Sequence, residues 1–125
     1  GHGTNTLFLP RVSERVFLMQ FEGFEHESLK NDQIQVTIGA CVEWDDLVEW
    51  SIEQGYGGIE AMIRIPGTCG AAPVQNIGAY GQELDHVLHR VRAFDTQKGV
   101  FRDFTPDECG FSYRDSMFKR PEGRH

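Results

Sequence analysis

The chain has few cysteines and no excess of basic residues. Its 125 residues include only three cysteines, Cys41, Cys69 and Cys109, with no close pair among them. A set this small and odd in number argues against a disulfide framework and fits reduced thiols in a cytoplasm. The net charge of −7 argues against a nucleic-acid-binding protein, because such proteins normally carry a basic face.

Long hydrophobic runs are also lacking. No apolar run approaches the ~20 residues that span a bilayer, and the first residues, GHGTNTLFLP, show no pattern of a secretory signal. A charged fraction of 25% and an apolar fraction of 39% are typical of a soluble globular protein. We therefore expect one domain, residues 1–125, in the cytoplasm, with no nucleic-acid or membrane partner.

The chain mixes strand and helix patterns without regular alternation. Residues 15–20 and 33–40 predict strands, residues 87–95 and 100–104 predict a hairpin, and residues 21–32 are interpreted as a polar connection. A helix is predicted over residues 43–54, with one apolar stripe formed by Trp44, Leu47, Val48 and Ile52. Gly55 and the glycines after it end this helix, and residues 105–111 predict a short capped helical turn. This order favours an α+β fold over a doubly wound parallel sheet.

Small residues and glycines are concentrated in residues 65–83, IPGTCGAAPVQNIGAYGQE. Glycine is costly in backbone entropy, so such a cluster predicts unusual backbone angles or a large group lying against the backbone. Pro66 suits a first helical turn, after which three residues could present N–H groups to a pyrophosphate: Gly67, Thr68 and Gly70. The amides of Gln75 and Asn76 could read the edge of a heterocycle. The alternative is a tightly packed turn with no ligand.

A second glycine-rich stretch, GHGTN, occupies residues 1–5. Such a stretch can turn N–H groups toward one anion, although a glycine-rich N-terminal remnant is the simpler interpretation. Neither stretch has the context of a Rossmann site or a P-loop. Two loops of this kind in one small domain nevertheless favour a phosphate-bearing cofactor.

The tetrapeptide YRDS places Arg114 between Tyr113 and Asp115. It could form an anion clamp, although a solvated surface arginine is the commoner fate of such a sequence. The pair His86 and His89 lies in a segment that we expect to be a strand, where residues three apart face opposite ways, so no metal site is predicted. The thiol of Cys69 is interpreted as a small packing group in preference to a reactive one.

Four ordered motifs resemble the MurB-type UDP-N-acetylenolpyruvoylglucosamine reductases, flavoenzymes of peptidoglycan precursor synthesis. They are GHGTNTLF, IGACVEWDDLVEW, GIEAMIRIPGTCGAAPVQNIGAYGQE and ECGFSYRDSMFK. The resemblance implies an α+β FAD-binding domain of the vanillyl-alcohol-oxidase and MurB type, not a Rossmann fold, truncated at both ends. In the family, a strand–helix segment precedes the first loop, and a substrate domain follows the arginine motif.

The resemblance also assigns site residues. It implies that the pyrophosphate of FAD is held by Gly1, Gly3, Thr4 and Asn5. It implies that the flavin and phosphates are lined by Pro66, Gly67, Gly70, Ala71, Ala72, Asn76 and Gly78. Tyr80 would face the substrate. Arg114 would bind the substrate and act in catalysis, oriented by Tyr113 and Asp115.

The implied reaction has two halves, in which NADPH reduces FAD and the enolpyruvyl double bond of a UDP-sugar then receives a hydride. Negative charge develops on the substrate carboxylate, and a fixed guanidinium there can contribute ~3–4 kcal/mol. The serine that protonates the substrate belongs to a part of the family outside this chain, and Ser116 is not its counterpart. Alone, the chain is expected to be inactive and to need the rest of its parent chain as a partner.

Three departures from the family pattern affect local geometry. Thr4 replaces a usual Ser, Cys41 stands where Gly is common, and Asp45 where His often follows the Trp. Two other functions remain open. One is a flavin- or nucleotide-binding module without turnover. The other is a related sugar or alcohol oxidase, in which His2 or Cys69 would attach the flavin covalently.

Overall fold

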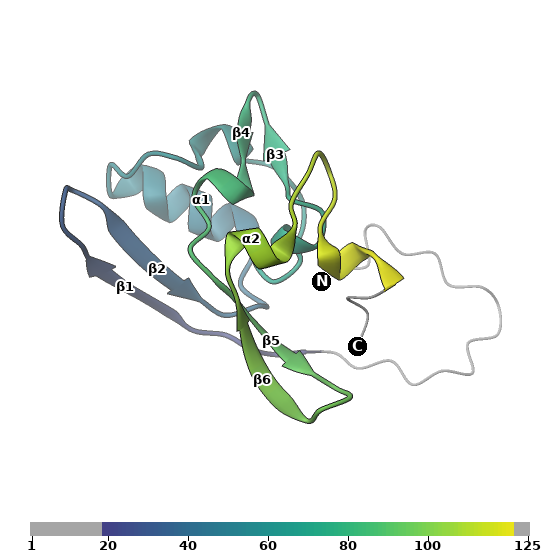
Figure 1. Cartoon of the computed structure of the whole chain (residues 1–125). Helices are drawn as coiled ribbons and strands as arrows, with labels where there is room; N and C mark the ends of the chain where they lie inside the picture. Colours follow the sequence, from purple (N-terminus) through teal and green to yellow (C-terminus); the bar gives the residue numbers. More distant parts are fainter. Residues whose placement is uncertain (1–18, 122–125) are drawn as a thin grey trace, which may run out of the picture.

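A computed structural model describes residues 19–121 of the chain. Six strands pair into three separate two-stranded antiparallel sheets: Phe24–Ser28 (β1) with Ile34–Ile38 (β2), Gly78–Ala79 (β3) with Gln82–Glu83 (β4), and Val91–Asp95 (β5) with Val100–Phe104 (β6) (Figure 1). The α-helices are Trp44–Glu53 (α1) and Pro106–Cys109 (α2), and short 3-10 turns cover Glu60–Met62, Ala72–Val74, Leu84–His86 and Met117–Lys119. The mixture of helices and strands confirms the α+β prediction.

The first hairpin corrects the sequence interpretation. Residues 21–32 were expected to be a polar connection, but β1 pairs with β2 from Phe24↔Ile38 to Ser28↔Ile34. Every residue of β1 is exposed, so the strand has no apolar alternation to reveal it. The turn carried the missed signal, because Asn31 and Asp32 adopt left-handed φ angles of 62° and 57°, which Asn and Asp tolerate better than most residues do.

Of the two neighbouring strand predictions, one is confirmed, and the described residues of the other form no strand. The strand predicted at residues 33–40 is confirmed over Ile34–Ile38. Of the strand predicted at residues 15–20, Met19 and Gln20 belong to no strand, and residues 15–18 lie outside the described part.

Helix α1 is confirmed to within one residue at each end. Its first-turn residue Trp44 and its residue Val48 are 3% and 0% exposed. The expectation that Ile52 also faces the core is wrong, because it is 48% exposed and Ser51 is buried instead. At 3.6 residues per turn, Ile52 lies about 80° around the helix from Trp44, at the margin of the buried stripe. Gly55, with φ 76°, follows the last turn as expected.

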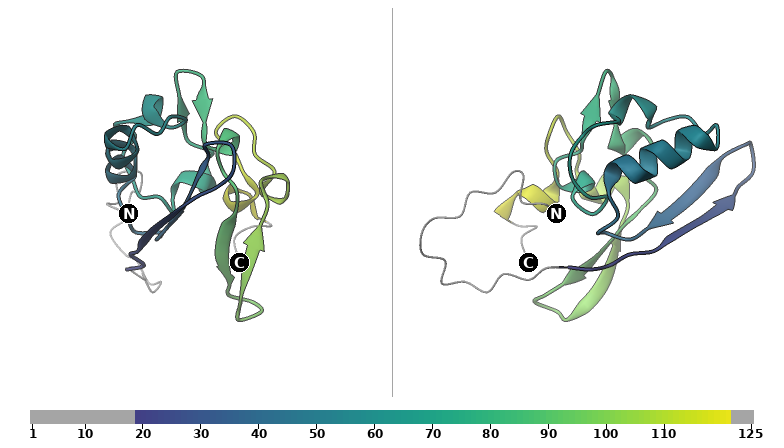
Figure 2. Two further views of the ribbon diagram at one scale, coloured as in Figure 1. Left: turned by 90° about the vertical axis from the view of Figure 1, so that its left-hand side faces the viewer. Right: turned by 180° about the vertical axis from the view of Figure 1, so that it is seen from behind.

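The core joins α1 to the glycine-rich loop. Its buried residues are Trp44, Leu47, Val48, Met62, Ala72, Ile77 and Leu84. Figure 2 shows α1 on one side of the molecule and the β5–β6 hairpin on the other, with the β3–β4 hairpin projecting between them. Loop residues therefore form part of the core, so the loop is a packed structural element as well as a candidate ligand site.

The second hairpin and the last helix agree largely with the sequence. The hairpin is confirmed, but β5 begins at Val91 and not at residue 87, because the segment before it forms the turn Leu84–His86. The capped turn is also confirmed: Thr105 and Glu108 form a reciprocal capping box at the start of α2. Phe104 packs edge-on against Phe118 with ring centroids 5.3 Å apart. This contact packs the turn Met117–Lys119 against the end of β6.

Candidate functional site

The glycine-rich loop runs alongside the start of α1. Trp44 donates its backbone N–H to the carbonyl of Gly67 over 2.9 Å, and the N–H groups of Cys69 and Gly70 bond to Val42 and Ala40 over 2.8 and 2.9 Å. Two expectations are therefore wrong. The first helical turn is Ala72–Val74 and does not contain Pro66, and the N–H of Gly70 is used inside the protein.

The positions of glycine in this loop are explained by two different structural requirements. A methyl group at Gly70 would lie 2.5 Å from the Cβ of Ala40, and one at Gly78 would lie 2.5 Å from the carbonyl oxygen of Gln82. Real carbon atoms do not approach that closely, so protein backbone fills the space beside both residues. Gly67 differs, since its φ of 131° favours glycine while the space beside it is open. Tight packing explains Gly70 and Gly78, whereas Gly67, like Gly81 at the tip of the β3–β4 hairpin, faces free space.

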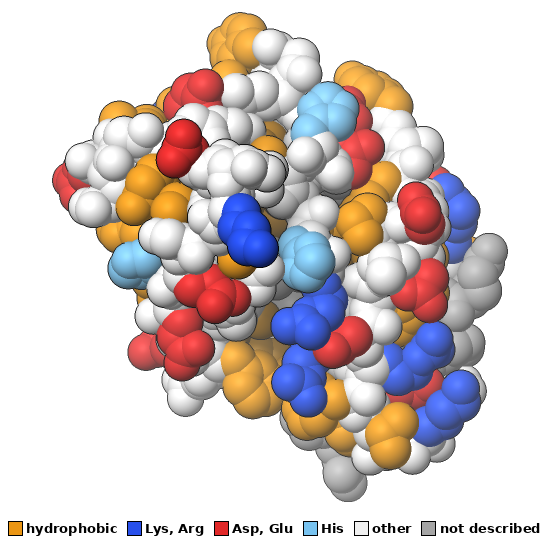
Figure 3. Space-filling model, turned by 60° about the vertical axis from the view of Figure 1, so that its left-hand side comes forward, with side chains coloured by type: hydrophobic (Ala, Val, Ile, Leu, Met, Phe, Trp, Pro, Cys, Tyr) orange, Lys and Arg blue, Asp and Glu red, His pale blue; other side chains and the backbone are white. Residues whose placement is uncertain are grey.

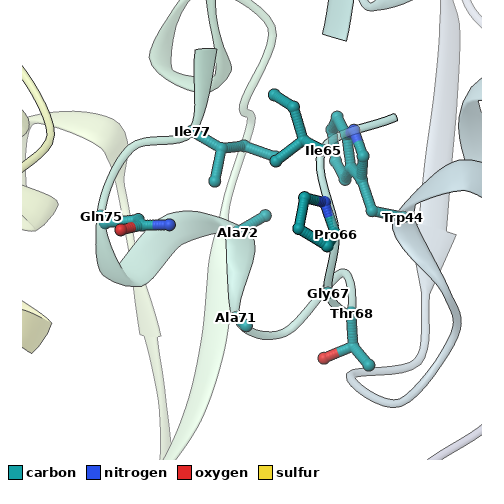
Figure 4. A pocket seen from close by; sticks show the side chains of 9 residues that line it. All are labelled: Trp44, Ile65, Pro66, Gly67, Thr68, Ala71, Ala72, Gln75 and Ile77. Carbon is teal, nitrogen blue, oxygen red and sulfur yellow. The ribbon is translucent and has the colours of Figure 1, made fainter. Parts of the chain in front are cut away.

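A small depression, partly open to solvent, lies beside Gly67 and has a free volume of about 20 Å³, roughly enough for one water molecule. Figure 4 shows Pro66 and Ala72 facing one another across it, with Gln75 at one end. Its lining residues are Trp44, Ile65, Pro66, Gly67, Thr68, Ala71, Ala72, Gln75 and Ile77. Four residues expected to line the flavin therefore meet at one place, whereas Gly70, Asn76 and Gly78 lie outside this lining.

The lining suits part of a flavin cofactor. None of the lining residues is ionisable, and the exposed positions Pro66 and Ala71 carry small side chains. Gly67 leaves open space where any other residue would place a side chain. This chemistry is compatible with the edge of a flavin, whose ring system is much larger than the depression, so most of the cofactor would lie outside it.

Asn76 is fully buried at 0% exposure, with φ 43°. Its Nδ2 donates to Oε2 of Glu83 over 3.0 Å and to the carbonyl of Ser112 over 3.4 Å, and its Oδ1 accepts the N–H of Asp85 over 3.1 Å. Its amide is consequently occupied by protein groups. The suggestion that this amide reads a heterocycle edge does not match its surroundings here. A cofactor contact through the backbone of Asn76 stays a prediction.

Arg114 lies in a tight turn in which Ser112 and Asp115 exchange two backbone hydrogen bonds of 3.1 and 3.0 Å. Its φ is 53°, so the turn holds a non-glycine residue in the left-handed region. Its Nη1 donates to the carbonyl of Asn76 over 3.2 Å, and its Nη2 donates to the carbonyl of Gly78. The structure thus brings the arginine motif onto the glycine-rich loop, 36 to 38 residues earlier in the chain.

The residues beside Arg114 fulfil their expected roles only in part. The guanidinium lies 5.2 Å from the ring centroid of Tyr113, as an orienting contact requires. Asp115 does not bond to it, because its Oδ2 accepts from Arg120 over 2.7 Å. The hydrogen bond from Arg120 lowers the pKa of Asp115 below its usual value. Backbone carbonyls therefore orient Arg114, which a tetrapeptide pattern cannot reveal.

Two exposed tyrosines flank this region. Tyr80 is 96% exposed at the tip of the β3–β4 hairpin, and Tyr113 is 79% exposed beside Arg114. Tyr80 and Gly81 have φ angles of 49° and 85°, a combination typical of a type I′ turn. A tyrosine is unusual there, because left-handed backbone favours Gly, Asn or Asp. The role of Tyr80 in facing a substrate stays a prediction.

The other candidate sites lose support. His86 ends a 3-10 turn and His89 lies in no strand, so the expected strand there is wrong, and residues 19–121 contain no group of three potential metal ligands. Burial, together with the charges of Glu43 and Asp46, raises the pKa of Cys69 to about 12, which supports its interpretation as a packing residue.

No helix within residues 19–121 is long and apolar enough to cross a bilayer. The proposed pyrophosphate residues Gly1, Gly3, Thr4 and Asn5 lie outside the described residues, as does His2.

Comparison with known proteins places these features in a family. A family model described as "FAD binding domain" matches residues 1–105. The UDP-N-acetylenolpyruvoylglucosamine reductase of Amoebophilus asiaticus is 44% identical over 95% of this chain and 35% of its own length, and that of Pseudomonas aeruginosa is 44% identical over 99% and 37%. The chain thus spans little more than a third of these curated relatives.

A solved structure agrees with the sequence comparisons. The crystal structure of UDP-N-acetylenolpyruvylglucosamine reductase (MurB) from Thermus caldophilus is 33% identical and superposes with a TM-score of 0.59 over 63% of this chain and 29% of that one. The resemblance inferred from the motifs and the α+β FAD-binding fold are both confirmed. The chain belongs to the FAD-binding-domain family, and its curated relatives named here are UDP-N-acetylenolpyruvoylglucosamine reductases.

Proposed function

We propose that this chain is the flavin-binding part of a cytoplasmic oxidoreductase that uses NADPH to reduce UDP-N-acetylglucosamine enolpyruvate in peptidoglycan precursor synthesis. The observation that carries the proposal is the docking of Arg114 on the carbonyls of Asn76 and Gly78. It puts a cation beside the loop that forms the depression. The names of the relatives supply the reaction class.

FAD, when bound, would carry a hydride from NADPH to the enolpyruvyl double bond. Among the described residues, those proposed to hold it are Pro66, Gly67, Gly70, Ala71, Ala72, Asn76 and Gly78. Four of these residues, Pro66, Gly67, Ala71 and Ala72, line the depression, and their small side chains leave room along the loop. Glycine-rich residues 1–5 are proposed to hold its pyrophosphate.

Arg114 is proposed to stabilise the negative charge that develops on the substrate carboxylate. A guanidinium has five N–H donors, and two bonds to loop carbonyls hold it while other donors stay available to a carboxylate. Because the protein fixes the group before reaction, little reorganisation is needed when charge develops. Tyr80, on the hairpin that begins at Gly78, is proposed to contact the same substrate.

A chimaera tests this proposal. The matched segment of the Pseudomonas aeruginosa relative is replaced by this chain, and NADPH oxidation is followed with the enolpyruvyl substrate. We expect turnover, and we expect Arg114→Lys to lower kcat about 10²–10³-fold, since Lys lacks the planar fork. The control is Arg90→Lys, at a half-exposed arginine paired with Asp103 over 3.3 Å. A folded, FAD-loaded chimaera without turnover would contradict the proposed reaction, and an unaffected Arg114→Lys would contradict the role of this residue.

A second candidate is a flavin-binding module without turnover. The chain matches 35–37% of the length of the curated relatives named above, so the test compares the chain alone with the chain joined to the remaining segments of a relative. We propose that the chain alone does not oxidise NADPH, and that adding the remaining segments of a relative restores oxidation. A well-folded complex that stays inactive would count against the reductase proposal.

Covalent attachment of flavin would indicate an oxidase instead. The raised pKa of Cys69 argues against attachment there, because the thiolate is the nucleophile. Acid precipitation should therefore release flavin from the loaded protein, and flavin that stays in the precipitate would favour the oxidase.

A further inference from the structure

The side chain of Asn76 lies where three segments of the chain meet. Its amide bonds to Glu83 in β4, to the backbone of Asp85 in the following turn, and to the backbone of Ser112 at the start of the arginine turn. Both of its N–H groups and its oxygen are therefore engaged. An unpaired buried amide is costly, so this geometry favours a single arrangement of the three segments.

Asn76 also touches the arginine turn through its backbone. Its carbonyl oxygen accepts Nη1 of Arg114 over 3.2 Å, while its side chain reaches Ser112 of the same turn. Both Asn76 and Arg114 adopt left-handed backbone angles, with φ 43° and 53°. Such angles cost energy for residues other than glycine, and they persist because surrounding bonds hold them. The direction of the Asn76 carbonyl thus depends on bonds that its own side chain makes.

We propose that Asn76 is a positioning residue for Arg114, because its side chain fixes the loop carbonyl that orients the guanidinium. Substituting the side chain would release Arg114 without removing any atom that touches the guanidinium. The importance of this positioning for catalysis rests on the proposed function. The contacts of Asn76 with Arg114 and with Ser112 are observed whatever the function of the chain.

A general stabilising effect must be separated from positioning, and Ser116 supplies the matched control. It is also 0% exposed, and its Oγ donates to the carbonyl of Val74 over 2.7 Å. It therefore ties the end of the arginine motif to the same loop, but through Val74 and not through Asn76 or Arg114. Ser116→Ala should destabilise the protein without releasing the guanidinium.

The partner Glu83 allows a rescue. Asn76→Asp keeps the oxygen that accepts from Asp85 but places a carboxylate where Nδ2 lay, 3.0 Å from the carboxylate of Glu83. Adding Glu83→Gln restores a donor and an acceptor with the direction of the bond reversed. The bond from Nδ2 to the carbonyl of Ser112 is not restored, because a carboxylate has no N–H. A positioning role therefore predicts that the double variant recovers part of what Asn76→Asp loses.

The measurement is the rotation of the Arg114 guanidinium, followed by ¹⁵N NMR on this chain without FAD. We expect rotation about fivefold faster in Asn76→Asp, the factor for one lost hydrogen bond of ~1 kcal/mol. We expect a change below about twofold in Ser116→Ala and partial recovery in the double variant. Unchanged rotation in a folded Asn76→Asp, equal release by Ser116→Ala, or rotation in the double variant as fast as in Asn76→Asp would each overturn the proposal. If Asn76→Asp does not fold, the double variant is measured instead. A double variant that folds and keeps slow guanidinium rotation would support the proposal, and one that folds with fast rotation would contradict it.

The same variants connect the proposal to activity in the chimaera. Asn76→Asp should lower kcat while leaving the KM for NADPH unchanged, because Arg114 is proposed to act on the charge that develops in the second substrate. Since the NMR measurement contains no FAD, a chain that fails to bind FAD contradicts the proposed function and leaves the positioning of Arg114 intact.

Discussion

Glycine serves two purposes in the loop of residues 65–83. At Gly70 and Gly78 the backbone passes so close to other parts of the protein that a side chain has no room, whereas at Gly67 the backbone angle requires glycine and the space beside it is open. A sequence shows only that glycine is concentrated there. The distinction matters for function, because only the second kind leaves room for a ligand.

Substitution of Gly70 tests the packing argument. Gly70→Ala places a methyl group 2.5 Å from the Cβ of Ala40 and 2.8 Å from its oxygen, so we expect a loss of about 1–3 kcal/mol in the free energy of unfolding. Gly57→Ala is the control, since its nearest neighbour is a Glu60 carboxylate oxygen at 3.9 Å. Urea unfolding measures both. Equal stability of the two variants would contradict the packing argument.

Asn76 shows why side-chain roles in this site were hard to predict. Its sequence neighbours suggest an amide that faces a ligand, yet its partners lie 7, 9 and 36 residues away, at Glu83, Asp85 and Ser112. The pattern at Arg114 misled in the same way. Adjacent Asp115 was its expected partner, but the tight turn directs that carboxylate to Arg120. Contacts between distant segments depend on the fold and leave no local pattern.

At the scale of elements, two local patterns were predictive: apolar periodicity and helix capping. Periodicity located α1 and β2, because each packs one face against the core. It failed for β1, whose five residues are all exposed. The turn residues Asn31 and Asp32 carried an unused signal for that hairpin, since Asn and Asp tolerate left-handed φ angles better than most residues do. The capping box of α2 was visible in the sequence TPDE, because its two partners, Thr105 and Glu108, lie only three residues apart.

The cap of α2 provides a stability prediction. Thr105→Ala removes the oxygen that accepts the N–H of Glu108 over 3.4 Å, and we expect a loss of about 1 kcal/mol at neutral pH. Thr96→Ala, at an exposed turn position, is the control. Thermal unfolding with both variants measures the difference, and an unchanged midpoint for Thr105→Ala would show that the cap contributes nothing to stability.

The stabilisation that this cap provides should depend on pH. Hydrogen bonds from the backbone and side chain of Thr105 lower the pKa of Glu108 below its usual value of 4.5. A lowered pKa in the folded state means that the stabilisation is present above pH 4.5 and is lost as the pH falls through the folded-state value. The difference between the unaltered chain and Thr105→Ala should therefore narrow in acid. A difference that is constant from pH 7 to pH 3 would contradict the assignment.

At the largest scale, residues 19–121 form three hairpins that lie around one small core. The core is formed by α1, the glycine-rich loop and the residues around it, while the β5–β6 hairpin carries the ring pair Phe94 and Phe101, which are 46% and 58% exposed. Figure 3 shows Lys and Arg side chains gathered over the lower right of one face, where this hairpin lies. There Arg90 and Arg92 share the single carboxylate of Asp103. The charge of −7 is therefore unevenly distributed.

Family membership was predictable at this scale because four motifs keep their order along the chain. The way the glycine-rich loop contributes to the core was not predictable, since Ala72 and Ile77 resemble ordinary loop residues in the sequence. The two properties are connected. A loop that packs against α1 on one side can present Gly67 and its neighbours, as a rigid wall, to a ligand on the other.

If this wall binds FAD, a titration of the chain with FAD, followed by flavin fluorescence and by the visible absorption band, should show saturable binding of one FAD per chain. Ala71→Leu should weaken it at least about tenfold, because a bulky side chain at this exposed position fills the depression. Ala93→Leu on β5, outside the depression, should not. A folded chain that does not bind FAD, or that binds equally well with Ala71→Leu, would contradict the assignment of this depression as the flavin site.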